Sequence, residues 1–204
     1  MRILVWNCRG AGNPNFRRNF AELIRSHRPS IAVLVETRIS GHRAEDISSN
    51  LGFNSVCRSE AVGFRGGIWL LWNSGEISLD VLMVTDQAIH ASIQVSPSQP
   101  QWLLSAVYAN PNLETRLKFW DHLVNFASTH SVPWVVAGDF NDILSSHEKL
   151  SSTPANSRRM NAFHNCLDAC NLLDLGFNGP RFTWTNKKRP RSCHGETRSI
   201  LLQS

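Results

Sequence analysis

The sequence has no long apolar run. No window approaches the roughly 18 consecutive apolar residues that a membrane-spanning helix needs. The start, MRILVWNCRG, holds one arginine and a short apolar run but lacks the apolar core and the cleavage site of a signal peptide. We therefore expect an intracellular protein, nuclear or cytoplasmic rather than secreted, that has no membrane partner.

Paired cysteines are also missing. The five cysteines, at positions 8, 57, 166, 170 and 193, are odd in number and scattered. None forms C-x-x-C, and no cysteine–histidine spacing matches a zinc site. This pattern excludes a disulfide framework and predicts reduced, mostly buried thiols. Repeats of 20–50 residues and low-complexity tracts are absent too, which excludes a solenoid.

Charged residues are sparse, and the excess of positive charge lies in the last 24 residues. Residues 1–180 contain 15 Lys/Arg and 15 Asp/Glu, whereas residues 181–204 contain six and one, which accounts for the net charge of +5. Two interpretations of this basic cluster are open. It could contact a phosphate backbone, or it could be a solvated tail.

Length and composition favour one globular domain. The chain has 204 residues, with 42% hydrophobic and 18% charged residues, which allows one substantial core. Apolar runs at residues 3–6 and 134–137, and the segment SIAVLVE at residues 30–36 with five apolar residues in its middle, predict strands that are buried on both faces. Residues 52–108 hold five short β-type runs separated by Gly, Asn and Ser, which predict a meander.

Helical periodicity appears in three places. Apolar residues recur at helical spacing from Phe16 to His27 and from Leu113 to Ala127. A third helix is predicted with Ser157 as its N-cap. Because helices alternate with strands at both ends and hairpins fill the middle, we predict an α/β (α+β) fold in which helices flank a mixed sheet pair.

Polar residues follow three of the predicted buried strands. Asn7 and Glu36 end the first two, and Asp139 with Asn141 ends the run WVVA at residues 134–137. Ligand sites gather at the carboxyl ends of strands in layered α/β proteins, and oxygen ligands of this kind suit Mg²⁺ and phosphodiester chemistry. The alternative interpretation is that each residue merely caps a turn.

The order of several motifs resembles that of the endonuclease/exonuclease/phosphatase superfamily. More narrowly, the sequence is similar to the apurinic-endonuclease-like domain of plant non-LTR (LINE-type) retrotransposons over about residues 1–186. The motifs that carry this resemblance are WNCRG (6–10), ETR (36–38), GGIWLLW (66–72), VYANP (107–111), GDFND (138–142) and LLDLGFNGPRFTW (172–184).

The resemblance implies a Mg²⁺-dependent, DNA-nicking hydrolase. Glu36 would be the principal metal ligand, with Asn7 beside it. Asp139 would position and deprotonate the attacking water, and Asn141 would hold the phosphoryl oxygen. Tyr108 would bind the phosphate, and Thr183 would contact the substrate. Apart from the resemblance, Arg9 in the loop after the first strand could contact a DNA phosphate, but the default interpretation is an ordinary surface arginine.

The resemblance also implies a four-layer sandwich of two mixed β-sheets with helices outside. Its usual closing signature, Ser-Asp-His, is absent from the 204 residues, and His194 follows Cys193 instead of an aspartate. We therefore expect a C-terminally truncated domain at residues 1–186 without its last strands, followed by a basic, divergent tail at residues 187–204. The cause would be a truncated element copy or a gene model that ends early.

Three functional interpretations follow. The first is a retroelement endonuclease that nicks DNA in full or residual form, with DNA as its partner and no obligate protein partner. The second is a non-catalytic remnant that binds nucleic acid weakly through its basic end. The third, a sugar- or lipid-phosphate phosphatase, fits the motif FTWTN (182–186) less well than the retroelement branch does.

Overall fold

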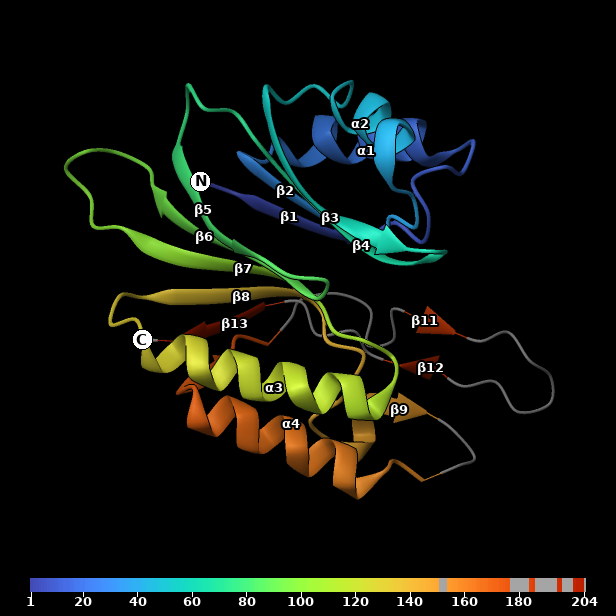
Figure 1. The fold of residues 1–204 in the computed structure, drawn as a ribbon, viewed down its shortest axis with the longest axis vertical. Helices are drawn as coiled ribbons and strands as arrows, with labels where there is room; N and C mark the ends of the chain where they lie inside the picture. Colours follow the sequence, from blue (N-terminus) through green and yellow to red (C-terminus); the bar gives the residue numbers. More distant parts are fainter. Residues whose placement is uncertain (151–153, 177–183, 186–193, 196–199, 204) are drawn as a thin grey trace. The chain divides into compact units, whose positions relative to one another are not determined.

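The computed structural model describes residues 1–150, 154–176, 184–185, 194–195 and 200–203. Within these residues it has an α/β fold with two large mixed β-sheets, a small three-stranded sheet and four α-helices, which confirms the predicted class. The chain divides into two compact units (Figure 1). The first contains residues 1–108 and 132–138, and the second contains residues 109–131 and 139–204. None of the helices in the described residues is long and apolar enough to span a membrane.

A four-stranded sheet in the order β1-β2-β4-β3 forms the centre of the first unit. Its strands are β1 (Ile3–Asn7), β2 (Ile31–Val35), β3 (Ser55–Val62) and β4 (Arg65–Trp72). β1 runs parallel to β2, while β4 is antiparallel to both β2 and β3. Every residue of β2 is buried, as predicted for a strand that is covered on both faces.

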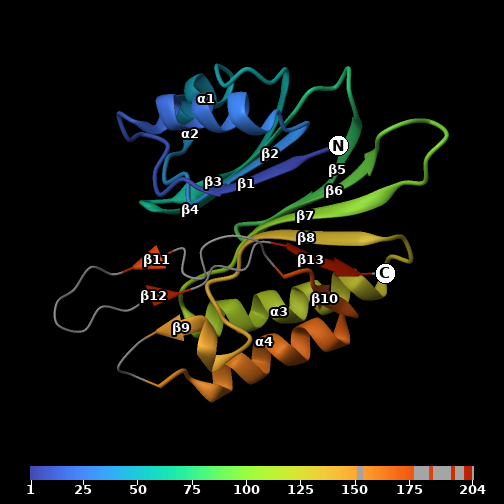
Figure 2. The same ribbon diagram turned by 180° about the vertical axis from the view of Figure 1, so that it is seen from behind.

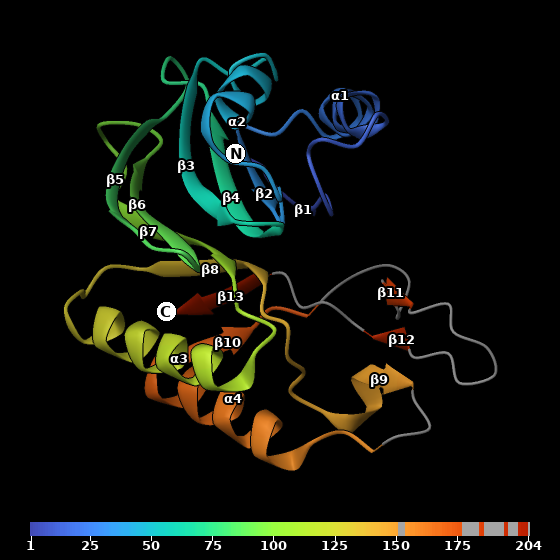
Figure 3. The same cartoon turned by 45° about the vertical axis from the view of Figure 1, so that its right-hand side comes forward.

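Strand β1 departs from the prediction of full burial. All five of its residues are only partly buried, because β1 lies at the edge of its sheet and only one neighbouring strand covers it. Helix α1 (Phe16–His27) lies beside this edge and is seen nearly end-on in Figure 3. Its apolar face was predicted correctly for Phe16 and Phe20, which are buried, but His27 is exposed.

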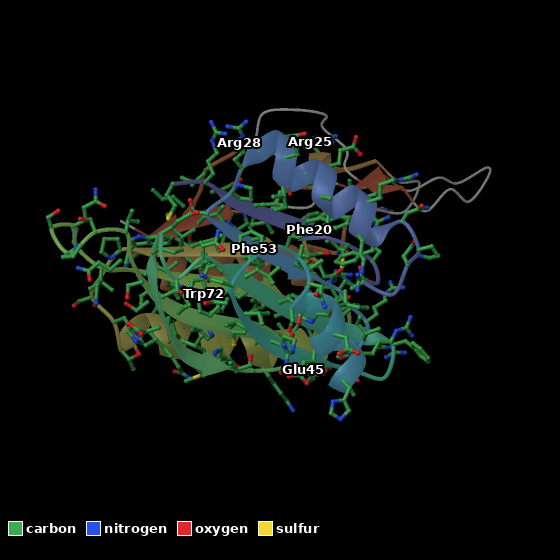
Figure 4. The ribbon with its side chains drawn as sticks, turned by 90° about the horizontal axis from the view of Figure 1, so that it is seen from above. Phe20, Arg25, Arg28, Glu45, Phe53 and Trp72 are labelled. Carbon is green, nitrogen blue, oxygen red and sulfur yellow. The ribbon has the colours of Figure 1, made fainter. Side chains whose placement is uncertain are left out.

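Helices α1 and α2 (Gly41–Ser48) cover one face of this sheet (Figure 1). An apolar cluster joins them to it, and the rings of Phe20 and Phe53 lie 6.4 Å apart (Figure 4). The buried members of this cluster are Ala11, Phe16, Phe20, Ala32, Leu34, Ala44, Leu51, Trp69 and Leu71. Helix α2 was not predicted, because its sequence GHRAEDIS offers only two apolar residues in eight.

The opposite face of the sheet packs against strands of the second sheet, namely β5 (Ser78–Val84), β6 (Ala88–Gln94) and β7 (Trp102–Tyr108). Strand β8 (Trp134–Asp139) lies next to β7, so these strands have the order β8-β7-β6-β5. The five β-type runs of residues 52–108 are therefore strands, as predicted. They do not form one meander, because the chain leaves the first sheet after β4 and enters the second at β5.

The second unit holds helices α3 (Leu113–Ser128) and α4 (Ser157–Ala169), which lie side by side (Figure 2). The N-cap of α4 is Asn156, whose side chain accepts a hydrogen bond from the Arg159 N–H, and not Ser157 as predicted. A short 3₁₀ helix, η1 (Ser146–Glu148), follows the loop after β8. The remaining strands are β9 (Lys149–Leu150), β10 (Leu172–Asp174), β11 (Trp184–Thr185), β12 (His194–Gly195) and β13 (Ile200–Gln203).

The four cysteines among the described residues form no disulfide, as predicted. Cys166 and Cys170 are buried, while Cys8 and Cys57 are partly buried. Cys193 lies outside the described residues.

Strand β7 closely approaches Gly138 in the neighbouring strand β8. A Cβ atom there would lie 1.8 Å from the carbonyl oxygen of Val107 in β7, and the residue has φ +155°. We expect Gly138→Ala to lower the free energy of unfolding by roughly 3 kcal/mol, because backbone atoms cannot move aside cheaply. Urea denaturation measures this, with Gly75→Ala as the control, since a Cβ at Gly75 meets nothing within 4 Å. Equal destabilisation by both variants would contradict the close approach.

Candidate active site

The first group of predicted site residues lies at the edge of the four-stranded sheet where β1 and β2 end and β4 begins. Because β1 and β2 are parallel and Asn7 pairs with Val35, the segments that follow them leave the sheet at the same edge. Strand β4 begins at this edge, since Val35 pairs with Ile68 across the antiparallel ladder. Asn7 and Glu36, far apart in sequence, are therefore neighbouring strand ends, as the sequence predicted.

The backbone at these strand ends adopts an uncommon conformation. Of six non-glycine residues with positive φ in the described part of the chain, four lie within three residues after the end of β1, β2 or β8: Arg9, Glu36, Arg38 and Asn141, with φ between 48° and 59°. Such a conformation costs on the order of 1–3 kcal/mol per residue and concentrates at functional sites. This clustering is independent support for a site at the strand ends.

Backbone hydrogen bonds hold the loops after β1 and β2 together. The Cys8 N–H donates to the Val35 carbonyl (3.1 Å), the Gly10 N–H donates to the Glu36 carbonyl (2.8 Å) and the Ala11 N–H donates to the Thr37 carbonyl (2.8 Å). These bonds continue the pairing of the two strands beyond the sheet. They fix the backbone that carries Asn7 and Glu36.

Glu36 forms an ion pair with Arg38, whose guanidinium donates to the Glu36 carboxylate. The hydrogen bond to this carboxylate raises the pKa of Arg38 above its usual value, so the arginine is fully charged. The Glu36 side chain is 15% exposed and the Arg38 side chain 43%. The carboxylate is thus held in place by an arginine that solvent or an anionic ligand can reach.

Both Asn7 and Asp139 cap the turns that follow them, as the alternative interpretation stated. Asn7 Oδ1 accepts from the Arg9 N–H (3.2 Å), and Asp139 Oδ1 accepts from the Asn141 N–H (2.9 Å). Each of these bonds holds the side-chain oxygen close to the backbone of its turn. The capping role therefore orients these side chains and does not exclude a role in a site.

The donor set at this sheet edge suits a hard cation with few protein ligands. Within the described residues, no group of three or more His, Cys, Asp or Glu side chains could hold a metal ion, so a closed protein cage is excluded there. Glu36 and Asn7 offer one carboxylate and one amide oxygen. This matches Mg²⁺, which binds through one or two carboxylates and completes its shell with water and phosphate.

Cys8 lies next to this edge without contributing to the chemistry. Its thiol donates to the Val35 carbonyl oxygen (3.4 Å), and burial raises its pKa to about 12. A thiol with this pKa is neutral near pH 7. Since only the thiolate is a strong nucleophile or metal ligand, Cys8 is a structural residue.

Tyr108, at the end of β7, lies near the start of β4. Its side chain is buried, and a Cβ atom at Gly66 would lie 3.8 Å from its ring. The Arg38 N–H donates to the Gly66 carbonyl (3.0 Å), and the Thr37 N–H donates to the Gly67 carbonyl (3.2 Å). The structure therefore brings Tyr108, the start of β4 and the segment after Glu36 together in the first unit.

The second group of predicted residues, Asp139 and Asn141, belongs to the second unit. The Asn141 side-chain amide donates to the Ala109 carbonyl (2.8 Å), and the Ala109 N–H donates to the Asp139 carbonyl (2.8 Å). Together with the bond from the Asn141 N–H to Asp139 Oδ1, these contacts fix both side chains on one tight turn.

Three charged residues that the sequence analysis missed hold this turn. Asp142 accepts from Arg116 Nε (2.9 Å) and from Arg159 Nε (3.3 Å), and we call these three residues the Asp142 clamp. Arg159 Nη2 also donates to the Asn141 carbonyl (2.7 Å). The clamp thereby connects α3 and α4 to the segment that carries Asp139 and Asn141.

The Arg116–Asp142 pair is almost completely buried, since the two side chains are 0% and 2% exposed. Burial lowers the pKa of Arg116, and the nearby carboxylates of Asp142 and Asp139 oppose this effect. The sequence contains an indication of this buried ion pair. Arg116 lies between Leu113 and Leu117 on the apolar face of a predicted helix, and a charge there requires a buried partner.

Of the remaining predicted residues, Arg9 is exposed, and Thr183 lies outside the described residues. The structure thus brings Asn7, Arg9, Glu36 and Tyr108 together at one sheet edge, and it places Asp139 and Asn141 on one turn of the second unit.

Comparisons with known proteins show the family and the fold of the chain. Residues 4–194 match the model of the endonuclease/exonuclease/phosphatase family. No curated protein sequence matches the chain.

Three solved structures share the fold. The AP endonuclease LMAP from Leishmania major is 12% identical with a TM-score of 0.73, and the match covers 99% of this chain and 78% of that one. The endonuclease domain of TRAS1, a telomere-specific non-LTR retrotransposon, is 13% identical with a TM-score of 0.68 and coverage of 100% and 85%. The 3'-5' exonuclease from Neisseria meningitidis is 18% identical with a TM-score of 0.69 and coverage of 100% and 87%.

We expect Asp142→Ala to lower the free energy of unfolding by roughly 3–5 kcal/mol, because it leaves Arg116 buried without a counter-charge. Chemical denaturation followed by circular dichroism measures the loss. The matched control is Glu114→Ala, which removes a carboxylate from the exposed pair with Arg158 (3.8 Å) and should change stability by less than about 1 kcal/mol. A loss in Asp142→Ala no larger than that in the control would contradict the clamp.

Proposed function

Because the chain belongs to the endonuclease/exonuclease/phosphatase family, we propose that it acts on DNA as a Mg²⁺-dependent phosphodiesterase. More narrowly, we propose the DNA-nicking endonuclease of a plant non-LTR (LINE-type) retroelement. The observation that carries the proposal is the pairing of Asn7 with Val35 at the end of β2, which places Asn7 and Glu36 on neighbouring strand ends, where Glu36 has a positive φ. The similarity to the TRAS1 endonuclease domain and to an AP endonuclease supports DNA as the substrate.

Glu36 and Asn7 would hold Mg²⁺. The ion would neutralise negative charge on the phosphate during hydrolysis. Arg38, which is ion-paired with Glu36 and partly exposed, would orient this carboxylate. Tyr108, buried beside the start of β4, would donate a hydrogen bond to the phosphate.

Asp139 would accept the proton of the attacking water, since a positioned carboxylate is an effective general base. Asn141 would hold the phosphoryl oxygen. Its side-chain amide carries two N–H groups, and the one that donates to the Ala109 carbonyl orients the other. Thr183 and Arg9 would contact DNA outside the reacting group. This activity requires no obligate protein partner and places the protein in the nucleus or cytoplasm.

A second candidate function is a non-catalytic retroelement remnant that binds nucleic acid weakly. The sequence supports it in two ways. The 204 residues contain no Ser-Asp-His signature, and residues 181–204 hold six basic residues against one acidic residue. In this interpretation residues 1–186 are the endonuclease-like domain, and residues 187–204 are a basic tail.

The metal site predicts a change in stability. We expect saturating Mg²⁺ to raise the melting temperature relative to EDTA, because a ligand that binds only the folded state stabilises it by about 2.7 kcal/mol at 100 times its Kd. Glu36→Gln should abolish the shift while keeping the shape of the side chain. Glu22→Gln, on the exposed surface of α1, is the control and should retain the shift. An unchanged melting temperature of the wild type in Mg²⁺ would count against the site.

The missing signature predicts slow catalysis. We expect the 204-residue chain to nick supercoiled plasmid in Mg²⁺ about 10²- to 10⁴-fold more slowly than a chimera whose residues 187–204 are replaced by a terminus with Ser-Asp-His, because a general acid/base group is restored. The Asp139→Ala variant is the inactive control. Rapid nicking by the natural chain that Asp139→Ala abolishes would overturn the remnant interpretation, whereas a folded but inert chimera would overturn the assigned site.

A further inference from the structure

The hairpin between β3 and β4 has an apolar tip that the fold does not cover. Val62 pairs with Arg65, so the turn consists of only Gly63 and Phe64. The Val62 side chain is 76% exposed, and that of Phe64 is 88% exposed, the highest value among the exposed large hydrophobic residues that the structure describes. A turn of two residues is tight, so it holds Phe64 in solvent on a short, defined support.

The base of this hairpin is tied to the candidate active site. The carbonyls of Gly66 and Gly67 accept from the N–H groups of Arg38 and Thr37, which directly follow Glu36. Gly66 also lies against the ring of Tyr108. The tip therefore extends from the same sheet edge of the first unit at which Asn7 and Glu36 end their strands.

Two exposed arginines belong to this hairpin or pair with it. Arg65 directly follows Phe64, and the Arg38 N–H donates to the Gly66 carbonyl at the base of the hairpin. The acidic side chains nearby are already paired, Glu36 with Arg38 and Glu60 with Arg58. The surface is complementary to a polyanion.

An exposed aromatic ring among arginines has the chemistry of a single-strand contact. Every base has a π-face that stacks on an aromatic side chain, and arginines follow the phosphates. A stable protein interface needs about 800 Å² per partner, which the two apolar side chains at this tip cannot supply alone.

We propose that the β3–β4 hairpin tip binds single-stranded DNA, with Phe64 stacking on an unpaired base while Arg65 and Arg38 contact the flanking phosphates. This inference rests on the proposed function, since it names the form of nucleic acid that the same sheet edge receives. It predicts a preference for unpaired or locally opened DNA over a closed duplex.

The test measures binding by the full 204-residue chain in EDTA, so that no cleavage occurs. The probe is a short single-stranded oligonucleotide with 2-aminopurine, read by anisotropy and by quenching of its fluorescence on stacking. We expect Phe64→Ala to weaken binding about tenfold and to remove the quenching, and Phe64→Trp to restore both. Leu82→Ala, which removes an exposed apolar side chain from β5, is the control and should leave both unchanged.

Equal affinity and quenching for the wild type and Phe64→Ala would overturn the proposal. The same holds if Phe64→Ala abolishes self-association of the chain without affecting DNA binding, because the tip would then contact a second copy. The Mg²⁺ melting shift separates this inference from the proposed function. If the shift is present but single-stranded DNA does not bind, only the hairpin contact fails, whereas Phe64-dependent binding without the shift would overturn the metal site alone.

Discussion

The ion pair between Asp142 and Arg116 is the interaction on which the geometry of the second unit depends. Neither side chain is appreciably exposed to water, so each requires the other to offset the cost of burying a charge. Arg116 also donates to the carbonyl of Asn110, and Arg159 donates to the carbonyl of Asn141. One carboxylate thus fixes the loop before α3 and the turn after β8. Asp139 and Asn141 owe their positions to a residue that takes no part in the proposed chemistry.

In the first unit, backbone hydrogen bonds instead of an ion pair position the predicted site residues. Hydrogen bonds join the segments after β1 and β2 beyond the last strand residues, and Arg9, Glu36 and Arg38 all take left-handed backbone there. This conformation turns the chain sharply at the sheet edge, so that Asn7 and Glu36 remain where the strands end. The proposed metal ligands and the base of the β3–β4 hairpin therefore share one rigid backbone frame.

The sequence predicts those parts of the fold that hydrophobic periodicity controls. β2 and the helical face of α1 at Phe16 and Phe20 follow from local patterns, and so does the strand-end position of Glu36. Features that depend on distant partners do not. The edge position of β1, the change of sheet after β4 and the short helix α2 are set by tertiary packing. Asp142 looks like an ordinary turn residue until the fold brings Arg116 and Arg159 against it.

The central claim is that the ends of β1 and β2 form a site for a divalent cation. The most direct measurement is paramagnetic broadening of backbone amide signals by Mn²⁺, a spectroscopic substitute for Mg²⁺, in a ¹⁵N-labelled sample. The account predicts that the signals of residues 7–9 and 36–38 broaden at the lowest Mn²⁺ concentration and recover when Mg²⁺ is added in excess. Broadening that begins instead around exposed carboxylates such as Asp80 and Asp86, with residues 36–38 unaffected, would contradict it.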